Sequence, residues 1–395
     1  MRQSWGVVVA LALAGQWVIC HAIGGGLPTP WNALLPGLGI FGAAFLLSWA
    51  AELAQLEIPQ ALALAILALI AVLPEYAVDM YFAWTAGRDP HYISFATANM
   101  TGGNRLLIGL GWPVVYLAYR LKTRRSQIVL DSAQGIEIAA LLAATLYSFI
   151  IPWKGTLSLL DTAVLLGLFS VYLLGASRAA HVEPELAGPA AAMARWPRDR
   201  RRLTMTSLFL LSGYTIFIAA KPFAEGLLTI GRTWGVEEFV LVQWLAPLAS
   251  ESPEFIVAIL FAWRGSAGAS LGTLVSSKVN QWTLLVGMLP LAYCLSAGRL
   301  AAMSLDARQL EEILLTSAQS LFAVSVLANF RFELWEAVLL LGLFATQLLL
   351  PSPTVRYGYA AAYLILTMIW LLSRRDRRQA VGQLLMTVRD DFLRR

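Results

Sequence analysis

The sequence is poor in charged residues, cysteine and histidine. Only 13% of its 395 residues are charged, against about 25% in an ordinary soluble domain. Two cysteines and three histidines are too few for a disulfide framework or a cysteine-based metal site. The histidines, His21, His91 and His181, all lie near the ends of hydrophobic segments, so a buried transition-metal centre is not expected. With 58% hydrophobic residues, the composition excludes a soluble globular domain and indicates an integral membrane protein.

Long hydrophobic segments recur along the whole chain. Each has about 20 residues, enough for a helix to cross roughly 30 Å of hydrocarbon. Short alternating strands of the kind found in outer-membrane barrels are not evident. The sequence therefore predicts an all-α polytopic membrane protein with about twelve transmembrane helices. The predicted spans are residues 5–22, 33–55, 58–85, 91–119, 133–151, 156–177, 204–229, 236–263, 268–295, 309–329, 333–351 and 357–373.

The net charge of +5 is unevenly distributed over the predicted loops. If the N-terminus is inside, most of the 29 Lys and Arg residues fall in both tails and in loops on that same side, as the positive-inside rule requires. The main basic clusters are residues 120–125, 195–202 and 374–395. This pattern argues against a nucleic-acid partner. It predicts a protein of the bacterial inner (plasma) membrane with cytoplasmic N- and C-termini, whose basic tail lies on the membrane surface as an amphipathic helix.

The first hydrophobic segment has two interpretations. Arg2 followed by an apolar run and Cys20-His21-Ala22 fits a cleaved signal peptide, whereas in a polytopic protein such a segment is more often retained as the first helix. We predict a retained helix. On either interpretation the next segment enters the membrane from outside.

Two hydrophobic segments carry a proline followed by a glutamate. Leu73-Pro74-Glu75 lies within residues 58–85, and Ser252-Pro253-Glu254 follows 179 residues later within residues 236–263. Proline removes a backbone donor, and a carboxylate in hydrocarbon costs several kcal/mol. Paired interrupted helices in corresponding halves are typical of a transporter's binding site near the bilayer midplane. We therefore predict an interrupted helix and a buried acid at each place.

A second acid accompanies each glutamate on the same helix face. Asp79 follows Glu75 by four residues, and Glu251 precedes Glu254 by three. Four carboxylates at this depth repel one another unless cations or protons neutralise them. A hard cation such as Ca²⁺ takes six to eight oxygen ligands. The acids therefore favour a cation site, although pairing of an acid with Lys278 or Arg105 to hold helices together remains an alternative, above all for Asp79. Further oxygen donors are Asn99, Thr101, Asn104, Ser250, Ser276 and Ser277.

The predicted topology makes the two Pro-Glu segments antiparallel. The Glu75 segment runs from inside to outside, and the Glu254 segment runs from outside to inside. We therefore predict two inverted five-helix repeats plus an extra helix at each end. The predicted parts are an extra N-terminal helix (1–30), a first half (31–180), a cytoplasmic linker (181–203), a second half (204–352) and an extra C-terminal helix with a basic tail (353–395). Each half contains one copy of an internal repeat, at about 66–113 in the first half and about 245–290 in the second.

These motifs resemble the alpha-repeats of the cation/calcium exchanger superfamily. That family has Gly-Thr-Ser-x-Pro-Glu and then Gly-Asn-x-x-Gly-Ser-Asn. Here Leu73-Pro74-Glu75 is followed by Asn99-Met-Thr-Gly-Gly-Asn104, and Ser250-Glu-Ser-Pro-Glu254 by Gly272-Thr-Leu-Val-Ser-Ser-Lys278. The two repeats cover roughly a quarter of the chain, and the plan of five spans per half extends the similarity to most of it.

The resemblance implies a function and a set of ligands. Members of the family are secondary active antiporters that exchange Ca²⁺ or related cations for Na⁺ or H⁺ by alternating access. It implies that Glu75 and Glu254 are the central cation ligands, with Asn99 as a side-chain ligand from the partner helix. Asn104 is expected to assist. The transported ions are the expected small-molecule partners beside the lipid bilayer, and no cofactor is expected.

The departures from the family pattern concern coupling. In the first repeat, Ala71-Val72 stands where the family has Thr-Ser. In the second repeat, Glu251 replaces a serine, Thr273 replaces an asparagine or aspartate, and Lys278 replaces the last asparagine of the pattern. A lysine can act as a tethered cation, and burial favours its neutral form. We therefore expect coupling to protons rather than Na⁺, with Lys278 or a carboxylate as the carrier. The residues expected to set selectivity or coupling are Asp79, Ser250, Glu251, Thr273 and Lys278.

The sequence leaves two questions open. Pairing Asn104 with Asn280 and Gly111 with Gly287 shifts the second partner helix by two residues, about 200° of rotation, and would turn Lys278 away from the site. The function also has alternatives, namely transport of another solute with Lys278 and Arg105 neutralising an anion, or a non-transporting membrane scaffold or sensor. An enzyme is not expected, because no serine or cysteine accompanies a buried histidine base.

Overall fold

A computed structural model describes residues 2–24, 26–57, 73–131, 134–178, 186, 188–350 and 352–373. Within these residues nearly every element is a helix, and the four strands are two or three residues long. Eight of the described helices are long and apolar enough to cross a bilayer. The prediction of an all-α polytopic membrane protein is therefore confirmed. The count of twelve spans stays a prediction, since residues 58–72 and the basic tail from residue 374 lie outside the described part of the chain.

The chain divides into two compact units, each assembled from two stretches of sequence. Unit 1 contains residues 1–99 and 182–257, and unit 2 contains residues 100–181 and 258–395. Two helices, α5 (Ile93–Leu106) and α12 (Glu238–Arg264), contribute residues to both units. The predicted boundaries of the two halves and of the terminal helices remain predictions.

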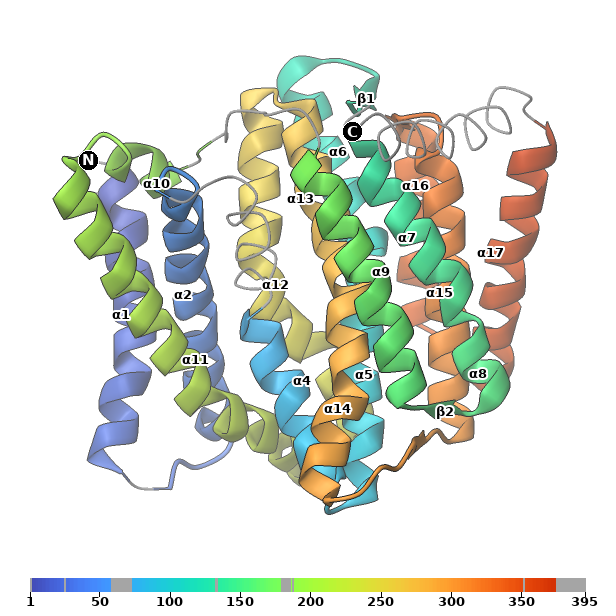
Figure 1. Cartoon of the computed structure of the whole chain (residues 1–395), viewed down its shortest axis with the longest axis horizontal. Helices are drawn as coiled ribbons and strands as arrows, with labels where there is room; N and C mark the ends of the chain where they lie inside the picture. Colours follow the sequence, from blue (N-terminus) through green and yellow to red (C-terminus); the bar gives the residue numbers. More distant parts are fainter. Residues whose placement is uncertain are drawn as a thin grey trace. The chain divides into compact units, whose positions relative to one another are not determined.

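Unit 1 is built on three helices that pack against one another: α1, α2 and α11 (Figure 1). Small residues bring their backbones close. A Cβ on Gly42 of α2 would come within 2.7 Å of the Ala10 carbonyl oxygen of α1, and a Cβ on Gly226 of α11 within 2.5 Å of the Asn32 carbonyl oxygen. Helix α4 packs against α11, and α10 packs against α1 and α2, within this unit. Its elements are α1 (Arg2–Ile23), α2 (Trp31–Ala54), α4 (Leu73–Ala86), η1 (Pro90–Tyr92), the start of α5, α10 (Gly188–Met193), α11 (Arg198–Trp234) and most of α12.

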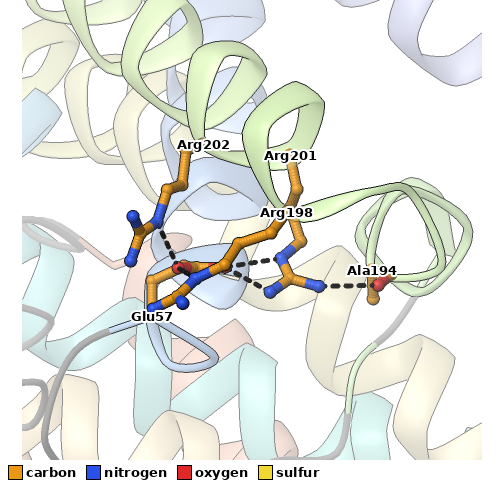
Figure 2. A network of polar contacts seen from close by, with 5 residues as sticks. All are labelled: Glu57, Ala194, Arg198, Arg201 and Arg202. Carbon is orange, nitrogen blue, oxygen red and sulfur yellow. Dashed lines mark hydrogen bonds and ion pairs between the residues drawn. The ribbon is translucent and has the colours of Figure 1, made fainter.

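One carboxylate ties α2 to the start of α11. Glu57 lies just beyond the end of α2, its side chain is only 4% exposed, and it accepts hydrogen bonds from Arg198, Arg201 and Arg202 (Figure 2). The arginine hydrogen bonds, that of Arg202 first, lower the pKa of Glu57 to about 2 from its ordinary value of 4.5. The folded protein therefore favours the ionised carboxylate.

This lowered pKa predicts an acid-dependent loss of stability. A carboxyl group whose pKa is depressed on folding stabilises the native state above its unfolded pKa, and this contribution disappears as the pH falls from about 4.5 towards 2. We expect Glu57→Gln to lower the midpoint of thermal unfolding at pH 7 by on the order of 2 °C. The difference from the wild type should shrink as the pH is lowered below 4. A difference that stays constant from pH 7 to pH 3 would contradict the assignment.

Unit 2 contains the remaining helices and all four strands. The strands form two antiparallel pairs, in which Gln127–Val129 pairs with Arg331–Glu333 and Thr156–Leu157 pairs with Met303–Ser304. The elements of unit 2 are the end of α5, η2 (Leu107–Gly111), α6 (Trp112–Thr123), β1 (Gln127–Val129), α7 (Gly135–Ser148), α8 (Ile150–Lys154), β2 (Thr156–Leu157), α9 (Leu159–Arg178), the end of α12, α13 (Ala267–Asn280), η4 (Gln281–Leu285), α14 (Val286–Ala297), β3 (Met303–Ser304), α15 (Ala307–Leu327), β4 (Arg331–Glu333), α16 (Leu334–Leu348) and α17 (Pro353–Ser373).

Two helical series, each interrupted by a π-helical turn, repeat the same plan at a constant spacing. In the first, α5 has 14 residues, the π-helical turn η2 has 5 and α6 has 12; α13, η4 and α14 have the same three lengths. Every boundary of the second series lies 174 residues after its counterpart in the first. The structure therefore fixes which residues of the two repeats are equivalent.

The two small sheets follow the same duplication. β1 and β3 precede α7 and α15, and β2 and β4 precede α9 and α16. In the duplication, β3 is the counterpart of β1 and β2 is the counterpart of β4. The β2–β3 pair is therefore the counterpart of the β1–β4 pair. In Figure 1 the labelled strands β1 and β2 lie at opposite ends of the helices of unit 2. This is the arrangement expected for repeats of opposite orientation.

The predicted interruption at Pro253 is wrong. Helix α12 runs without a break through Pro247 and Pro253, and the hydroxyl of Ser250 donates to the Ala246 carbonyl at 3.1 Å. An unwound backbone inside a bilayer would expose polar groups that water cannot satisfy, whereas transmembrane helices absorb proline by local adjustment. The irregular turns lie instead in the partner helices, at η2 and η4. The corresponding prediction at Pro74 falls partly on residues 58–72, outside the described residues.

Candidate functional site

The first pair of predicted acids lies on α4, within unit 1. Glu75 is 2% exposed and Asp79 is completely buried, and their spacing of four residues puts them on one helix face. The helix is held against α11 by Tyr81, whose hydroxyl donates to the Glu225 carboxylate, and by Tyr92, which donates to the same carboxylate at 2.9 Å. These contacts fix the position of the two acids relative to α11.

The second pair of acids lies on α12, in the same unit. Glu251 is 2% exposed, while Glu254 is partly exposed. Ser250, one turn before Glu254, is buried and directs its hydroxyl hydrogen to its own helix, so its oxygen lone pairs remain available for a cation. Each Pro-Glu glutamate is followed nine residues later by a tryptophan, Trp84 or Trp263, and both tryptophans are about half exposed (45% and 51%).

Asn99 of α5 is a buried amide of this unit. It is completely buried and lies close enough to Asp79 to interact with that carboxylate. Among the described residues, none of the four side-chain oxygen and nitrogen atoms of Asn99 and Asp79 makes a hydrogen bond of ordinary geometry. Buried polar atoms are nearly always paired. A carboxylate and an amide oxygen left in this state suit a bound cation or a proton.

The polar centres of the two partner helices meet within unit 2. Lys278 of α13 is completely buried, donates a hydrogen bond of 2.7 Å to Asn104 Oδ1 and lies 4.4 Å from the centre of the Trp282 ring. Asn104 in turn donates through Nδ2 to the Met100 carbonyl at 2.7 Å. Its amide is therefore occupied on both sides, as the partner of the lysine.

The repeat spacing shows that Lys278 and Asn104 occupy equivalent positions in the two repeats. With a constant offset of 174 residues, Lys278 is the equivalent of Asn104, and Thr273 is the equivalent of Asn99. The alternative pairing of Asn104 with Asn280 does not fit the element boundaries. Two equivalent residues that contact each other lie on either side of the axis that relates the repeats. The Lys278–Asn104 hydrogen bond thus crosses the pseudo-two-fold axis, which in inverted repeats lies in the plane of the membrane.

Thr273 differs from the residue it replaces. Its side chain is partly exposed, and its hydroxyl donates to the Ala269 carbonyl at 2.7 Å. A threonine oxygen is a weaker cation ligand than an amide or a carboxylate. The two repeats are therefore chemically unequal at the position of Asn99.

Arg105 is neutralised by Glu312, an acid that belongs to none of the sequence motifs. Its guanidinium contacts Glu312 of α15 at 2.8 Å, with both side chains buried. Arg356 of α17 contacts Glu311 at 2.8 Å and Glu312 at 3.8 Å. Arg105 is already paired with Glu312, so its charge is not available to an anionic solute. The alternative function, in which Arg105 and Lys278 together neutralise such a solute, therefore has only Lys278 left.

Other polar groups of unit 2 could not be predicted. Gln281 is completely buried in the π-helical turn η4, and neither of its amide atoms is hydrogen-bonded to a described residue. The turn itself has no recognisable sequence signal. Glu312 lies near the start of a predicted span, where a carboxylate would ordinarily reach water, so its pairing with Arg105 was not foreseeable.

The described residues contain no group of three or more His, Cys, Asp and Glu side chains of the kind that hold a resident metal ion. A transported cation held there would thus need amide, hydroxyl or carbonyl oxygens beside carboxylates. The predicted donors Asn99 and Ser250 lie in the same unit as the four acids. Asn104, Thr273 and Lys278 belong to unit 2.

A mainly helical membrane protein with a duplicated helical series, each copy interrupted by a π-helical turn, and with buried acids on α4 and α12 has the features of a secondary transporter. A family model described as sodium/calcium exchanger protein matches residues 31–177 and 204–352, which is most of the chain. The chain belongs to the sodium/calcium exchanger family, and is accordingly a cation antiporter rather than an enzyme.

Comparison with solved structures agrees with this assignment. The chain is similar to the H⁺/Ca²⁺ exchanger CAX, with 44% identity, a TM-score of 0.94 and 99% of each chain covered. It shares its fold with YfkE (14% identity, TM-score 0.62, 90% of this chain and 99% of that chain). It also shares the fold of the sodium-calcium exchanger NCX_Mj (17% identity, TM-score 0.54, 80% and 96%). No curated protein sequence matches the chain.

Proposed function

We propose that the protein exchanges Ca²⁺, or a chemically related hard cation, for protons by alternating access. The observation that carries this proposal is the buried pair Glu75 and Asp79 on α4, with the Asn99 amide close to Asp79, together with Glu251 and Glu254 on α12 of the same unit. Carboxylate and amide oxygens are the ligands that Ca²⁺ prefers. The similarity to the H⁺/Ca²⁺ exchanger CAX at 44% identity supports the same pair of ions.

In this proposal Glu75 and Glu254 bind the cation, with Asn99 as a third ligand. Asp79, Glu251 and Ser250 set the charge and the number of oxygens available to it. Thr273 contributes to selectivity by replacing an amide in the second repeat. Asn104 assists through Lys278, from which its side-chain oxygen accepts a hydrogen bond.

The counter-ion is assigned to protons rather than Na⁺ from the residues that are missing. Hydroxyls that precede the Pro-Glu pair in the family pattern are replaced by Ala71 and Val72. A buried lysine or carboxylate changes its charge by one proton, which is the event that a proton-coupled exchanger requires. Lys278 is the candidate of unit 2, and the four acids of α4 and α12 are the candidates of unit 1.

We also propose a membrane orientation. The basic residues of the start of α11 and of the loop after α6 place these regions on the cytoplasmic side by the positive-inside rule. Both termini are then cytoplasmic, and the membrane is the bacterial inner membrane. Cysteine labelling from either side of sealed vesicles would test this orientation.

Flux measurements in proteoliposomes test the proposed exchange. Vesicles loaded with acidic buffer and diluted into Ca²⁺ at higher external pH should take up Ca²⁺, because outward proton flow drives inward cation flow. Collapsing the pH gradient with a protonophore and a potassium/valinomycin clamp should stop net uptake, and an imposed Na⁺ gradient should not restore it. Uptake that ignores the pH gradient and follows Na⁺ would overturn proton coupling. Absence of flux with every cation tested would favour another solute or a non-transporting role.

A further inference from the structure

We propose that Arg198 and Arg202 form a binding site for the phosphate headgroup of an anionic phospholipid, organised by Glu57. The two arginines lie one helical turn apart at the start of α11, and both are exposed, at 68% and 46%. The Glu57 carboxylate between them is 4% exposed. The site is separate from the buried acids of α4 and α12.

The geometry of the arginines leaves their terminal amino groups available. Arg198 and Arg202 contact Glu57 through Nε, at 3.4 and 2.6 Å. Within the described residues no hydrogen bond involves Nη1 or Nη2 of either arginine. Arg201 differs, because it is only 18% exposed and also donates to the Ala194 carbonyl at 3.1 Å (Figure 2). Arg201 therefore holds Glu57 in place, while the other two arginines present their outer donors to a ligand.

The charge balance calls for an anion. Three arginines surround one carboxylate, which leaves two positive charges in excess. A fourth arginine, Arg200, stacks over the Trp196 ring at 4.2 Å, and adds to the positive potential. Arginine binds phosphate oxygens with two parallel N–H groups, so guanidinium groups whose Nε atoms are anchored are already oriented for that contact.

The position of the cluster on α11 indicates a lipid as the source of the phosphate. The helix has 37 residues, about 55 Å of length against a hydrocarbon thickness of roughly 30 Å, so it extends beyond the hydrocarbon. Along the helix that follows Arg202, the side chains of Leu203, Leu210 and Phe217 are exposed at 70%, 70% and 81%. Their spacing of seven residues puts them on one face. Arg198 and Arg202 lie at the same end of the helix as Leu203, about a quarter of a turn around the axis from this apolar face, so their long side chains can reach the phosphate of a lipid whose acyl chains cover it.

The site can be tested by lipid binding to the purified full-length protein in detergent. Native mass spectrometry with phosphatidylglycerol and phosphatidylcholine should show preferential retention of phosphatidylglycerol by the wild type. The double variant Arg198→Gln/Arg202→Gln keeps Arg201 beside Glu57 and should retain it at least about fivefold less. The matched control Lys122→Gln/Arg125→Gln removes two exposed charges at the end of α6 and in the loop that follows and should bind as the wild type does. Equal losses in both double variants would overturn the proposed site.

Glu57→Gln separates an organised site from simple charge attraction. Removing the negative charge makes the cluster more positive, so an unspecific basic patch would bind phosphatidylglycerol more tightly. An organised pair of arginines loses its anchor and should bind no more tightly, with a smaller preference over phosphatidylcholine. Tighter binding by this variant would contradict the proposal, as would equal competition by inorganic phosphate, which would identify a free-anion site. Bound lipid is counted on folded protein only, so a loss of stability does not imitate the result.

Discussion

Glu75→Gln and Glu254→Gln are each expected to reduce cation flux at least ~100-fold. Glutamine keeps the shape of the side chain and one carbonyl oxygen but removes the negative charge that a buried divalent cation requires. Leaving a buried charge without its partner costs about 3 kcal/mol or more, which corresponds to roughly a hundredfold in affinity. The measurement is initial Ca²⁺ uptake into proteoliposomes at matched protein density.

The control variant for this experiment lies on the same helix as Glu254. Glu238→Gln changes a partly exposed glutamate at the start of α12 that pairs with Arg232 at 2.7 Å, and flux should stay near that of the wild type. Thermal unfolding provides a second measurement. Saturating Ca²⁺ should raise the unfolding midpoint of the wild type and of Glu238→Gln, but not that of the two site variants. Normal flux in both site variants would show that these acids do not bind the transported ion.

Substitution of Lys278 is expected to separate transport from proton coupling. Lys278→Asn restores the amide of the family pattern at the position equivalent to Asn104, and asparagine has no titratable group. If the amine carries the counter-transported proton, the variant should still move Ca²⁺ down its own gradient. The stimulation of uptake by a pH gradient should fall about tenfold. The measurement is the ratio of uptake rates with and without the pH gradient.

Lys278→Arg is the complementary variant. Arginine keeps the positive charge and cannot release its proton at any accessible pH, so a mechanism that needs deprotonation at this position should stop. We expect loss of both driven and passive uptake, while Lys278→Asn retains the passive component. If Lys278→Arg transports and couples normally, the proton is carried by the carboxylates of α4 or α12 instead.

Much of the fold could be predicted because hydropathy determines it directly. Wherever a predicted span falls on described residues, a helix or a direct succession of helices occupies it. The equivalence of Lys278 and Asn104 could be proposed from the motifs but not decided, because Asn280 offered a second alignment. The π-helical turns of equal length decide it, and such turns depend on packing rather than on a local pattern.

The polar contacts were much harder to predict, because each joins residues far apart in sequence. Nothing in the sequence around Glu57 indicates its partners, because the arginines lie more than 140 residues later. Arg105 looked available for a substrate, but Glu312 neutralises it. Pro253 suggested a broken helix, yet α12 is continuous. For Glu57 and Arg105 the residue type indicates the chemistry but not the partner, whereas at Pro253 the local prediction itself is wrong.

The hydrogen bond between Lys278 and Asn104 also bears on how the protein originated. A precursor assembled from two identical subunits would place the same side chain on both sides of its symmetry axis. Two lysines there would repel each other, whereas two asparagines can exchange hydrogen bonds. A mixed pair requires that the two copies mutate independently, which becomes possible only once the gene has duplicated.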